Sequence, residues 1–273
     1  MKILRSLLAA CLCLFSVTTL AAPKADLWPR WRLSDHMNSE KIDHSAWEAF
    51  LGKYVKASPD GVNRVAYGAV SDADKHALDQ YLDAMQAVHI SGHSSAEQRA
   101  YWINLYNAAT LKVVLDHYPV KSILEINISP GWFAKGPWGR QLLMVEDEPI
   151  TLDDIEHRIL RPVWKDPRTH YSVNCASYGC PNLQPHAFTP ANMDAMLDAA
   201  ARAYVNHPRG ARVENGQLIV SSIYTWFKED FGGDDAGVIA HLRKYAEPKL
   251  AAQLVGITRI SDDRYDWSLN EAR

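Results

Sequence analysis

The chain has 273 residues, of which 47% are hydrophobic and nine are tryptophan, so it can bury a substantial core. Its formal net charge is −3 and it has no long run of Lys and Arg, which excludes the electrostatic footprint of a nucleic-acid-binding protein. Beyond the first 21 residues, no apolar stretch is long enough to cross a bilayer.

Residues 1–21 have the pattern of an export signal. Lys2 and Arg5 give a positive start, an apolar run follows from Leu7 to Val17, and small residues precede a cleavage point after Ala21. This segment has two basic and no acidic residues, so the remaining chain carries a formal charge of −5. We expect an exported protein, periplasmic in a Gram-negative bacterium, with no membrane span after cleavage.

Three parts are expected along the chain: a signal peptide over 1–21, an N-terminal arm over 22–45 and a single globular domain over 46–273. The sequence has no internal repeat and no low-complexity tract. A lipoprotein cleavage box ending at Cys11 is the alternative to the signal peptide. It is disfavoured because apolar residues continue past Cys11, whereas such a box closes the apolar region.

Helical periodicity and capping residues predict most of the secondary structure. Ser95-Ala-Glu-Gln98 has the form of a capping box at the start of the strongest helix, which Pro119 ends. Thr189-Pro190 has the form of a cap and first turn. The predicted helices cover 44–55, Ser71–His89, Ser95–His117, a segment after Thr151 that stops before Pro162, 190–206, 222–231 and Gly237–Ala246.

Alternating and turn-flanked segments predict the strands. Residues 141–150 form an expected hairpin, and 211–222 form another around Asn215-Gly216, a type I′ turn signal. Residues 169–175 alternate like a strand that ends at Cys175. The fold class is therefore α+β, with several helices packed around a small, mostly antiparallel sheet. This content is compatible with a papain- or transglutaminase-like arrangement.

Cys175 and Cys180 are the only cysteines expected after cleavage, and they leave three readings open. In an oxidising compartment they can pair as a disulfide. With His186 they form C-x4-C-x5-H, which is not a standard zinc spacing, so no metal and no other cofactor is expected. Alternatively, Cys175 is a nucleophile that needs a nearby base, with backbone amides at Ala176 and Ser177 as an oxyanion hole.

The expected strand helps to choose a base for Cys175. A regular strand places His170 and Cys175 on opposite faces, so His170 points away from the thiol. His157, on the preceding helix beside Glu156, can approach from outside the strand. Its i+4 neighbour Arg161 favours the neutral imidazole that a base needs. His157 is therefore the preferred base, and a hydrogen-bonded core histidine is the alternative reading.

Asn104 and Asn107 lie inside the otherwise apolar helix Ser95–His117. Asparagine is a mediocre helix former because its amide competes for backbone hydrogen bonds. The two side chains are therefore expected to contact something outside the helix: either a neighbouring loop that they hold in place or a functional site that they line.

Five blocks together resemble one known family. They are "YWINLYNAATLKVVL", "TLDDIEHRILRP", "DPRTHYSVNCASYGCPNL", "SSIYTWFKEDF" and "YDWSLN". In this order they are similar to the domain-of-unknown-function family number 547 (DUF547), over roughly Trp47 to Asn270. The resemblance implies a single domain, bacterial export, and one cluster of Asn, His and Cys side chains. It carries no established activity. Its characteristic positions are Asn104, Tyr106, Asn107, Glu156, His157, Arg161, His170, Cys175, Cys180 and Pro181.

Two functional hypotheses follow. The first is a cell-envelope binding or scaffold domain for an unknown small-molecule or protein partner, with the loop Trp132–Trp138 as contact surface. The second is a Cys-dependent hydrolase or acyltransferase. Its candidate catalytic residues are Cys175 as nucleophile, His157 as base, Glu156 to orient the imidazole, and Asn104, Asn107 and His170 around them.

Overall fold

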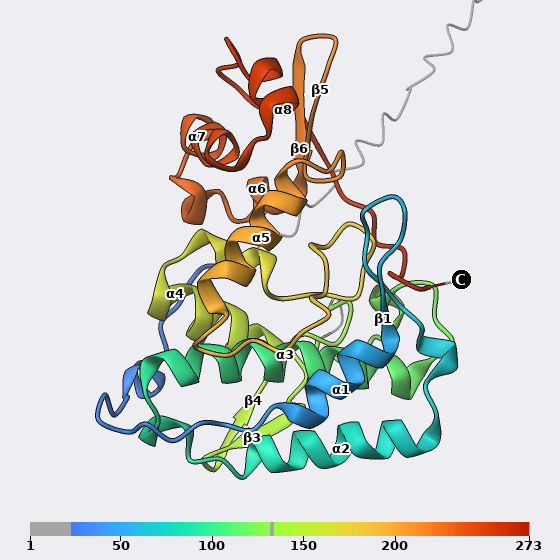
Figure 1. Cartoon of the computed structure of the whole chain (residues 1–273), viewed down its shortest axis with the longest axis vertical. Coiled ribbons are helices and arrows are strands. Elements are labelled where there is room, and N and C mark those ends of the chain that lie inside the picture. Colours follow the sequence, from blue (N-terminus) through green and yellow to red (C-terminus); the bar gives the residue numbers. More distant parts are fainter. Residues whose placement is uncertain (1–22, 132–133, 273) are drawn as a thin grey trace, which may run out of the picture.

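Helix α3 (Ser95–His117) runs through the centre of the fold. All of its residues from Glu97 to Leu115 are buried except Lys112, so neighbouring elements surround it on every side. The computed structural model describes residues 23–131 and 134–272, and the expected signal peptide lies outside them. In Figure 1, α1, α2 and α3 lie in the lower half of the molecule, α5 lies in its middle, and α6 to α8 with β5 and β6 form the upper part.

The helices follow the capping signals with small shifts. Ser71 caps α2 as expected, by accepting from the Asp74 N–H. The cap of α3 is Ser94 rather than Ser95. Helix α5 begins at Met193, because Thr189 and Asn192 bond to each other in a preceding turn. Besides α3, the α-helices have these bounds: α1 Ser45–Tyr54, α2 Asp72–Gln86, α4 Arg161–Trp164, α5 Met193–Val205, α6 Ser222–Trp226, α7 Asp235–Tyr245 and α8 Pro248–Gln253.

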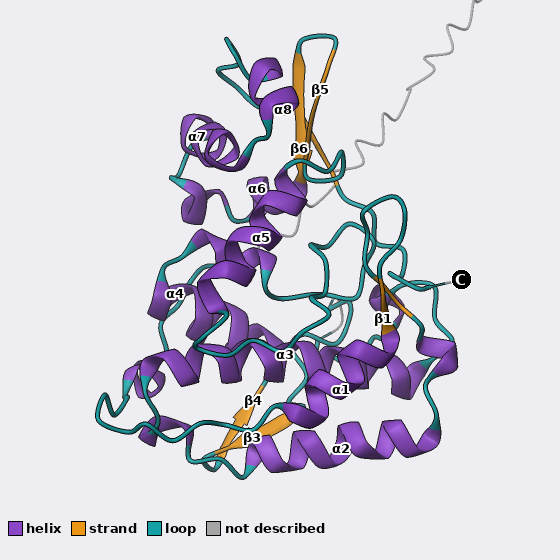
Figure 2. Ribbon diagram, in the orientation of Figure 1, coloured by secondary structure: helices purple, strands orange, loops and turns teal. Residues whose placement is uncertain are grey.

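The strands form small sheets, which confirms the α+β class and both predicted hairpins (Figure 2). Two are two-stranded: β1 (Val55–Lys56) with β2 (Arg64–Val65), and β3 (Leu143–Val145) with β4 (Glu148–Ile150). The third has the order β5 (Ala211–Glu214), β6 (Gln217–Ser221) and β7 (Asp262–Arg264). Its β5–β6 pair is antiparallel around the predicted turn, whereas β6–β7 is parallel. The strands are thus divided among three sheets rather than gathered in one.

The buried apolar residues form two clusters. The larger one surrounds α3 and includes Trp47 of α1, Tyr81 of α2 and Trp102. The smaller one joins α5, α6 and α7 beneath the third sheet. No helix in residues 23–131 or 134–272 is long and apolar enough to cross a membrane.

The segment after Thr151 differs from its prediction in a way that shapes the site. The Thr151 hydroxyl caps it as expected by accepting from the Asp154 N–H, but the helix does not stop before Pro162. Residues Asp154–Leu160 form a π-helix that continues into α4. Arg161 N–H donates to the Glu156 carbonyl, five residues back, so the His157 carbonyl loses its usual partner. Pro162 has no N–H for the Arg158 carbonyl.

The N-terminal arm satisfies both of these carbonyls. The Asp26 N–H donates to the His157 carbonyl at 3.0 Å, and the Trp28 N–H donates to the Arg158 carbonyl at 3.0 Å. The arm therefore pairs with the side of the helix that the π turn and the proline leave open.

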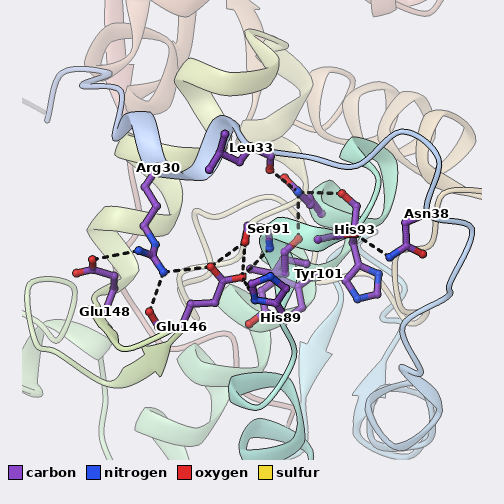
Figure 3. A network of polar contacts seen from close by, with 12 residues as sticks. Arg30, Leu33, Asn38, His89, Ser91, His93, Tyr101, Glu146 and Glu148 are labelled. Carbon is purple, nitrogen blue, oxygen red and sulfur yellow. Dashed lines mark hydrogen bonds and ion pairs between the residues drawn. The ribbon is translucent and has the colours of Figure 1, made fainter.

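A buried carboxylate holds the arm farther along its length (Figure 3). Arg30 donates to the Glu146 carboxylate at 3.2 Å, and Ser91 donates to the same carboxylate from its N–H and its hydroxyl. Trp31 is buried against Trp102 of α3, with ring centroids 5.1 Å apart. The arm is thus part of the packed structure.

The expected strand 169–175 is wrong. Residues Pro167–Tyr171 form a 3-10 helix, because Asp166 caps it by accepting from the Arg168 N–H and Pro167 supplies the fixed φ of a first helical turn. The prediction that His170 and Cys175 lie on opposite faces of a strand therefore does not apply. The residues that follow, from Ser172 to Leu183, form an irregular loop that carries both cysteines.

Candidate active site around Cys175

Asparagine side chains fix the backbone of the cysteine loop. Asn107 of α3 donates to the Ser172 carbonyl at 2.8 Å and accepts from the Asn174 N–H at 2.8 Å. One turn earlier in α3, the Asn104 amide donates to the Phe188 carbonyl at 2.8 Å and accepts from the Phe188 N–H at 2.9 Å. Both amides are buried; Asn107 has its backbone partners in the loop, and Asn104 has its partner just after the loop. They position the loop, which is the first of the two roles expected for them.

Asn174 shapes the turn directly after the nucleophile candidate. Its side-chain oxygen accepts from the Ala176 N–H at 2.9 Å, and its amide donates to the Pro181 carbonyl at 2.7 Å. Ala176 has a φ of 57°, a left-handed conformation that is uncommon for a residue with a Cβ. Because the Ala176 N–H is already bonded, it is not free to serve in the expected oxyanion hole.

The C-terminal segment closes over the same loop. Tyr178 N–H donates to the Ser268 carbonyl at 2.7 Å, and Gly179 N–H donates to the Asp266 carbonyl at 2.8 Å. A Cβ at Gly179 would lie 2.8 Å from the Asp266 nitrogen, so glycine permits this close approach. The pairing brings Tyr265 to the cysteine.

The Cys175 sulfur is surrounded by hydroxyl groups. Its Sγ lies 3.0 Å from Tyr265 Oη and 3.2 Å from Ser177 Oγ, and these two oxygens are 2.9 Å apart. Burial raises the pKa of the Cys175 thiol, but donation from Cys180, Ser177 and Tyr265 outweighs it and holds this pKa below the ordinary cysteine value. Cys175 as a residue is half-buried, and these donors favour its thiolate form.

Cys180 differs from Cys175 in both its burial and the direction of its pKa shift. It is buried, and burial together with the neighbouring Cys175 raises the pKa of its thiol well above the ordinary value. Its sulfur accepts from the Cys175 N–H at 3.0 Å. Both cysteines are free thiols in this structure, and a Cys175–Cys180 disulfide stays a prediction for oxidising conditions.

We expect Tyr265→Phe to raise the pKa of Cys175, because it removes one hydroxyl donor to the thiolate and leaves the aromatic packing. A hydrogen bond to a charged group contributes about 1.5–3 kcal/mol, so alkylation by iodoacetamide at neutral pH should slow roughly tenfold or more. The rate is followed against pH by mass spectrometry. An unchanged midpoint in the variant would show that Tyr265 does not stabilise the thiolate.

A second group of ionisable side chains lies behind the cysteine loop. Asp230 accepts from His170 Nε2 at 2.7 Å and from Arg161 Nε at 2.6 Å. His170 Nδ1 lies 3.6 Å from a Glu156 oxygen, and Arg161 also contacts His157 Nδ1 at 3.0 Å. We refer to Glu156, His157, Arg161, His170 and Asp230 as the buried ion cluster.

The cluster holds charge on some members and excludes it from others. Burial opposes ionisation of Glu156, but His157, His170 and Arg161 lower its pKa to about 2. Burial likewise opposes a charge on His170, but Asp230 and Glu156 raise its pKa. For His157, burial dominates and lowers the pKa to about 4, so this imidazole is neutral at pH 7. His170 lies between the carboxylates of Glu156 and Asp230, which favour its protonated form.

His157 is the base expected for Cys175, and both of its ring nitrogens face other partners. Within the described part of the chain, no hydrogen bond joins the Cys175 sulfur to a histidine. The Nδ1 of His157 faces Arg161, and its Nε2 lies 3.7 Å from Asp153. His186 lies at the surface and pairs with Glu48. Glu156 is nevertheless close enough for its charge to act on Cys175, so cluster and thiol are neighbours.

Tyr106 of α3 interacts with both the buried ion cluster and the two cysteines. Its buried hydroxyl donates to Glu156 at 3.2 Å. Burial raises the pKa of this phenol, and the charges of Glu156, Cys175, Cys180 and Asp153 add to the effect. The charges of the cluster and of both cysteines therefore act on this hydroxyl.

Aromatic side chains from distant segments flank the thiol. The Tyr265 ring lies 4.6 Å from Trp267 and 4.8 Å from Trp226, measured between ring centroids. Trp267 in turn packs edge-on against Trp138 at 5.8 Å. All four side chains are half-buried, and we call them the aromatic wall.

Sequence reasoning missed Asp153, Asp230 and Tyr265. Tyr265 and Asp230 fall inside blocks that resemble the family, which is the only signal that singled out their neighbourhoods. Among the described residues, no three His, Cys, Asp or Glu side chains are grouped to hold a metal ion.

Buried neutral histidines predict a loss of stability in mild acid. Burial lowers the pKa of His44, as of His157, to about 4, whereas the unfolded chain protonates both near 6.5. The unfolded state therefore binds the extra protons as the pH falls from 6.5 to 4, and the folded state loses stability over this window. In His44→Gln, the loss of unfolding free energy between pH 7 and pH 5 should be smaller than in wild type by about 2 kcal/mol. Urea unfolding at both pH values measures it, and equal losses in the two proteins would contradict the assignment.

Comparison with known proteins gives one match. Residues 90–205 match a family model described as "Protein of unknown function, DUF547". No curated protein and no solved structure matches the chain. The matched range contains both cysteines and every candidate catalytic residue predicted from sequence, whereas Asp230, Tyr265, Trp226 and Trp267 lie beyond its end.

Proposed function

We propose that this DUF547 domain-containing protein is a cysteine-dependent hydrolase or acyltransferase in which Cys175 is the nucleophile. The observation that carries the proposal is the setting of the Cys175 sulfur, which is half-buried and lies within 3.2 Å of two hydroxyl groups. The proposal keeps the expectation of export, which rests on residues 1–21.

A preformed thiolate removes the need for a histidine base at the first step. In a cysteine enzyme the thiolate attacks, and a base is needed only where the free thiol predominates. Donation from Cys180, Ser177 and Tyr265 lowers the pKa of Cys175 and so favours this anion. The role first given to His157 is therefore not required for attack on an acyl carbon.

The hydroxyl groups of Tyr265 and Ser177 have a second role in the attack on the acyl carbon. Once the sulfur bonds to carbon, it no longer holds a full negative charge, and the developing charge moves to the acyl oxygen. Tyr265 Oη and Ser177 Oγ can turn their protons toward that oxygen, because both lie at the sulfur and neither is fixed by a backbone partner in the described residues. They are our candidates for the oxyanion donors in place of Ala176.

The neighbouring thiol supports the assignment of nucleophile to Cys175 rather than Cys180. Cys180 is buried and remains protonated, so it is neither exposed nor ionised enough to attack a substrate. It supplies a donor to Cys175 and would oxidise with it under oxidising conditions. Activity should therefore be measured with a thiol reductant present.

The test is trapping of an acyl-enzyme. The reduced full-length protein is mixed with p-nitrophenyl acetate and followed by p-nitrophenolate release and by intact mass. We expect the uptake of one acetyl group, located on Cys175 by peptide mapping, followed by its hydrolysis. The binding or scaffold hypothesis predicts no acetylation of Cys175 beyond that of an unfolded control, and that result would replace the enzyme proposal.

A further inference from the structure

Cys175 and Cys180 lie in contact in the site loop, and side-chain hydrogen bonds hold them there. The Cys175 N–H donates to the Cys180 sulfur at 3.0 Å, and the Cys180 thiol donates to the Cys175 sulfur. Asn174 bonds on both sides of the pair. Its side-chain oxygen accepts from the Ala176 N–H at 2.9 Å, and its amide donates to the Pro181 carbonyl at 2.7 Å. The two sulfurs are therefore neighbours in the reduced protein.

The two thiols differ in access and in ionisation. Cys175 is half-buried, whereas Cys180 is only 5% exposed. Burial opposes ionisation of Cys175, but the hydrogen bonds that its sulfur receives lower its pKa, and burial raises the pKa of Cys180 well above the ordinary value. Cysteines that are readily oxidised combine a favoured thiolate, some access to solvent and a neighbouring thiol that forms a disulfide with them. Cys175 has the first two properties, and Cys180 supplies the third.

The hydroxyl groups beside Cys175 suit a peroxide as well as an acyl oxygen. Tyr265 Oη and Ser177 Oγ lie 3.0 and 3.2 Å from the Cys175 sulfur and 2.9 Å from each other. When a thiolate attacks a hydroperoxide, negative charge develops on the oxygen that leaves. Hydroxyl groups at the sulfur can donate hydrogen bonds to the two peroxide oxygens and stabilise this charge.

We propose that Cys175 and Cys180 also form a thiol pair that reduces small hydroperoxides, with Cys175 as the attacking thiol and Cys180 as the resolving thiol. The reaction goes beyond the proposed function, because it uses the same nucleophile but needs no acyl substrate. Hydrogen peroxide and short alkyl hydroperoxides are the substrate class, since they are small enough for a half-buried residue. The disulfide expected from the sequence is then an intermediate of a reaction cycle.

Three steps complete this cycle. The Cys175 thiolate bonds to the terminal oxygen of the hydroperoxide, the O–O bond breaks, and the other oxygen leaves as an alkoxide or hydroxide that takes a proton from water. Cys175 is then a sulfenic acid, and the peroxide has gained the two electrons that the sulfur lost. Next, the Cys180 sulfur bonds to the Cys175 sulfur, and the sulfenic hydroxyl leaves with the Cys180 proton as water. A dithiol reductant finally returns the disulfide to two thiols and becomes a disulfide itself.

Dimedone, which bonds to sulfenic acids and not to thiols, identifies the thiol that reacts first. The reduced full-length protein, freed of reductant, is treated with hydrogen peroxide, and peptide mapping separates the site cysteines from Cys11 and Cys13. In wild type we expect a Cys175–Cys180 disulfide. It should form about tenfold or more faster than in the urea-unfolded protein, where a thiol is only a few per cent ionised at pH 7. In Cys180→Ala we expect a dimedone adduct at Cys175 instead.

Cys175→Ala is the matched control. It should leave Cys180 reduced at the same peroxide concentration, because Cys180 is buried and protonated. With dithiothreitol present, wild type should consume many equivalents of peroxide, and Cys175→Ala should consume it at the rate of dithiothreitol alone. Three results would overturn the inference: oxidation of wild type no faster than in urea, no adduct in Cys180→Ala, or oxidation of Cys180 in Cys175→Ala at the wild-type rate.

The acetylation assay distinguishes this inference from the proposed function. Acetylation of Cys175 by p-nitrophenyl acetate, without rapid disulfide formation by peroxide, would remove the hydroperoxide reaction and leave the hydrolase proposal in place. Rapid disulfide formation without acetylation would remove the hydrolase proposal alone.

Discussion

Cys175→Ala should take up no acetyl group from p-nitrophenyl acetate, and its release of p-nitrophenolate should fall to that of the uncatalysed reaction. The change removes the only thiol in the described residues that is both half-exposed and held below its ordinary pKa. It leaves the buried contacts of the loop through Asn107 and Asn174 in place. Intact mass and the release kinetics measure the effect.

Cys180→Ala is the matched control, because it removes the neighbouring thiol of the same loop. The variant should still be acetylated at Cys175, more slowly at neutral pH, since one donor to the thiolate is lost. Two results would exclude Cys175 as the nucleophile: loss of acetylation in Cys180→Ala, or acetylation of Cys175→Ala at the wild-type rate.

Arg161→Met should lower the free energy of unfolding by about 3–5 kcal/mol, the range for breaking a buried ion pair by removing one partner. The guanidinium is almost fully buried and bonds to Asp230, to His157 and to the Pro23 carbonyl of the arm. Without it, the half-buried Asp230 carboxylate keeps, among the described residues, its hydrogen bond from His170. Urea unfolding followed by tryptophan fluorescence gives the value.

The control for this prediction is Arg212→Met. Arg212 pairs with Glu214 at the surface of the β5–β6 hairpin, with 29% and 56% of the two side chains exposed. Exposed pairs contribute at most about 1 kcal/mol, so this variant should be nearly as stable as wild type. Equal losses in the two variants would show that the buried ion cluster does not contribute more than a surface pair.

Local sequence signals predicted the elements that depend on local contacts. Helix α3 has the predicted bounds, Ser95–His117, because its apolar residues and the following Pro119 agree, although its cap is Ser94 rather than Ser95. The β5–β6 hairpin formed around Asn215-Gly216, where both residues adopt the positive φ that such a turn needs. Asn104 and Asn107 also contacted partners outside their helix, as their residue type indicated.

The errors arose where two local signals competed. The alternation in residues 169–175 indicated a strand, but the Asp166-Pro167 pair starts a 3-10 helix, and the capping interaction prevailed. The geometric argument that separated His170 from Cys175 failed with it. Pro162 indicated a helix end, but the π turn and the N-terminal arm satisfy the carbonyls that it leaves open, so the helix continues.

The remaining site residues depend on contacts that no local pattern contains. Tyr265 reaches Cys175 across 90 positions of sequence, and Asp230 reaches His170 across 60. Asp153 looks, in sequence, like an ordinary acidic residue in a first helical turn. Its raised pKa follows from burial beside Glu156, which only the folded structure supplies.

The most direct test of the account is the rate of Cys175 alkylation by iodoacetamide against pH, in wild type and in His157→Gln. We predict that wild type reacts with a midpoint below the ordinary cysteine pKa of about 8.5. His157→Gln should keep that midpoint, because the sulfur is stabilised by Ser177, Tyr265 and Cys180 and not by a histidine. An ordinary midpoint in wild type would contradict the thiolate, and a low midpoint that is lost in His157→Gln would restore the histidine as its partner.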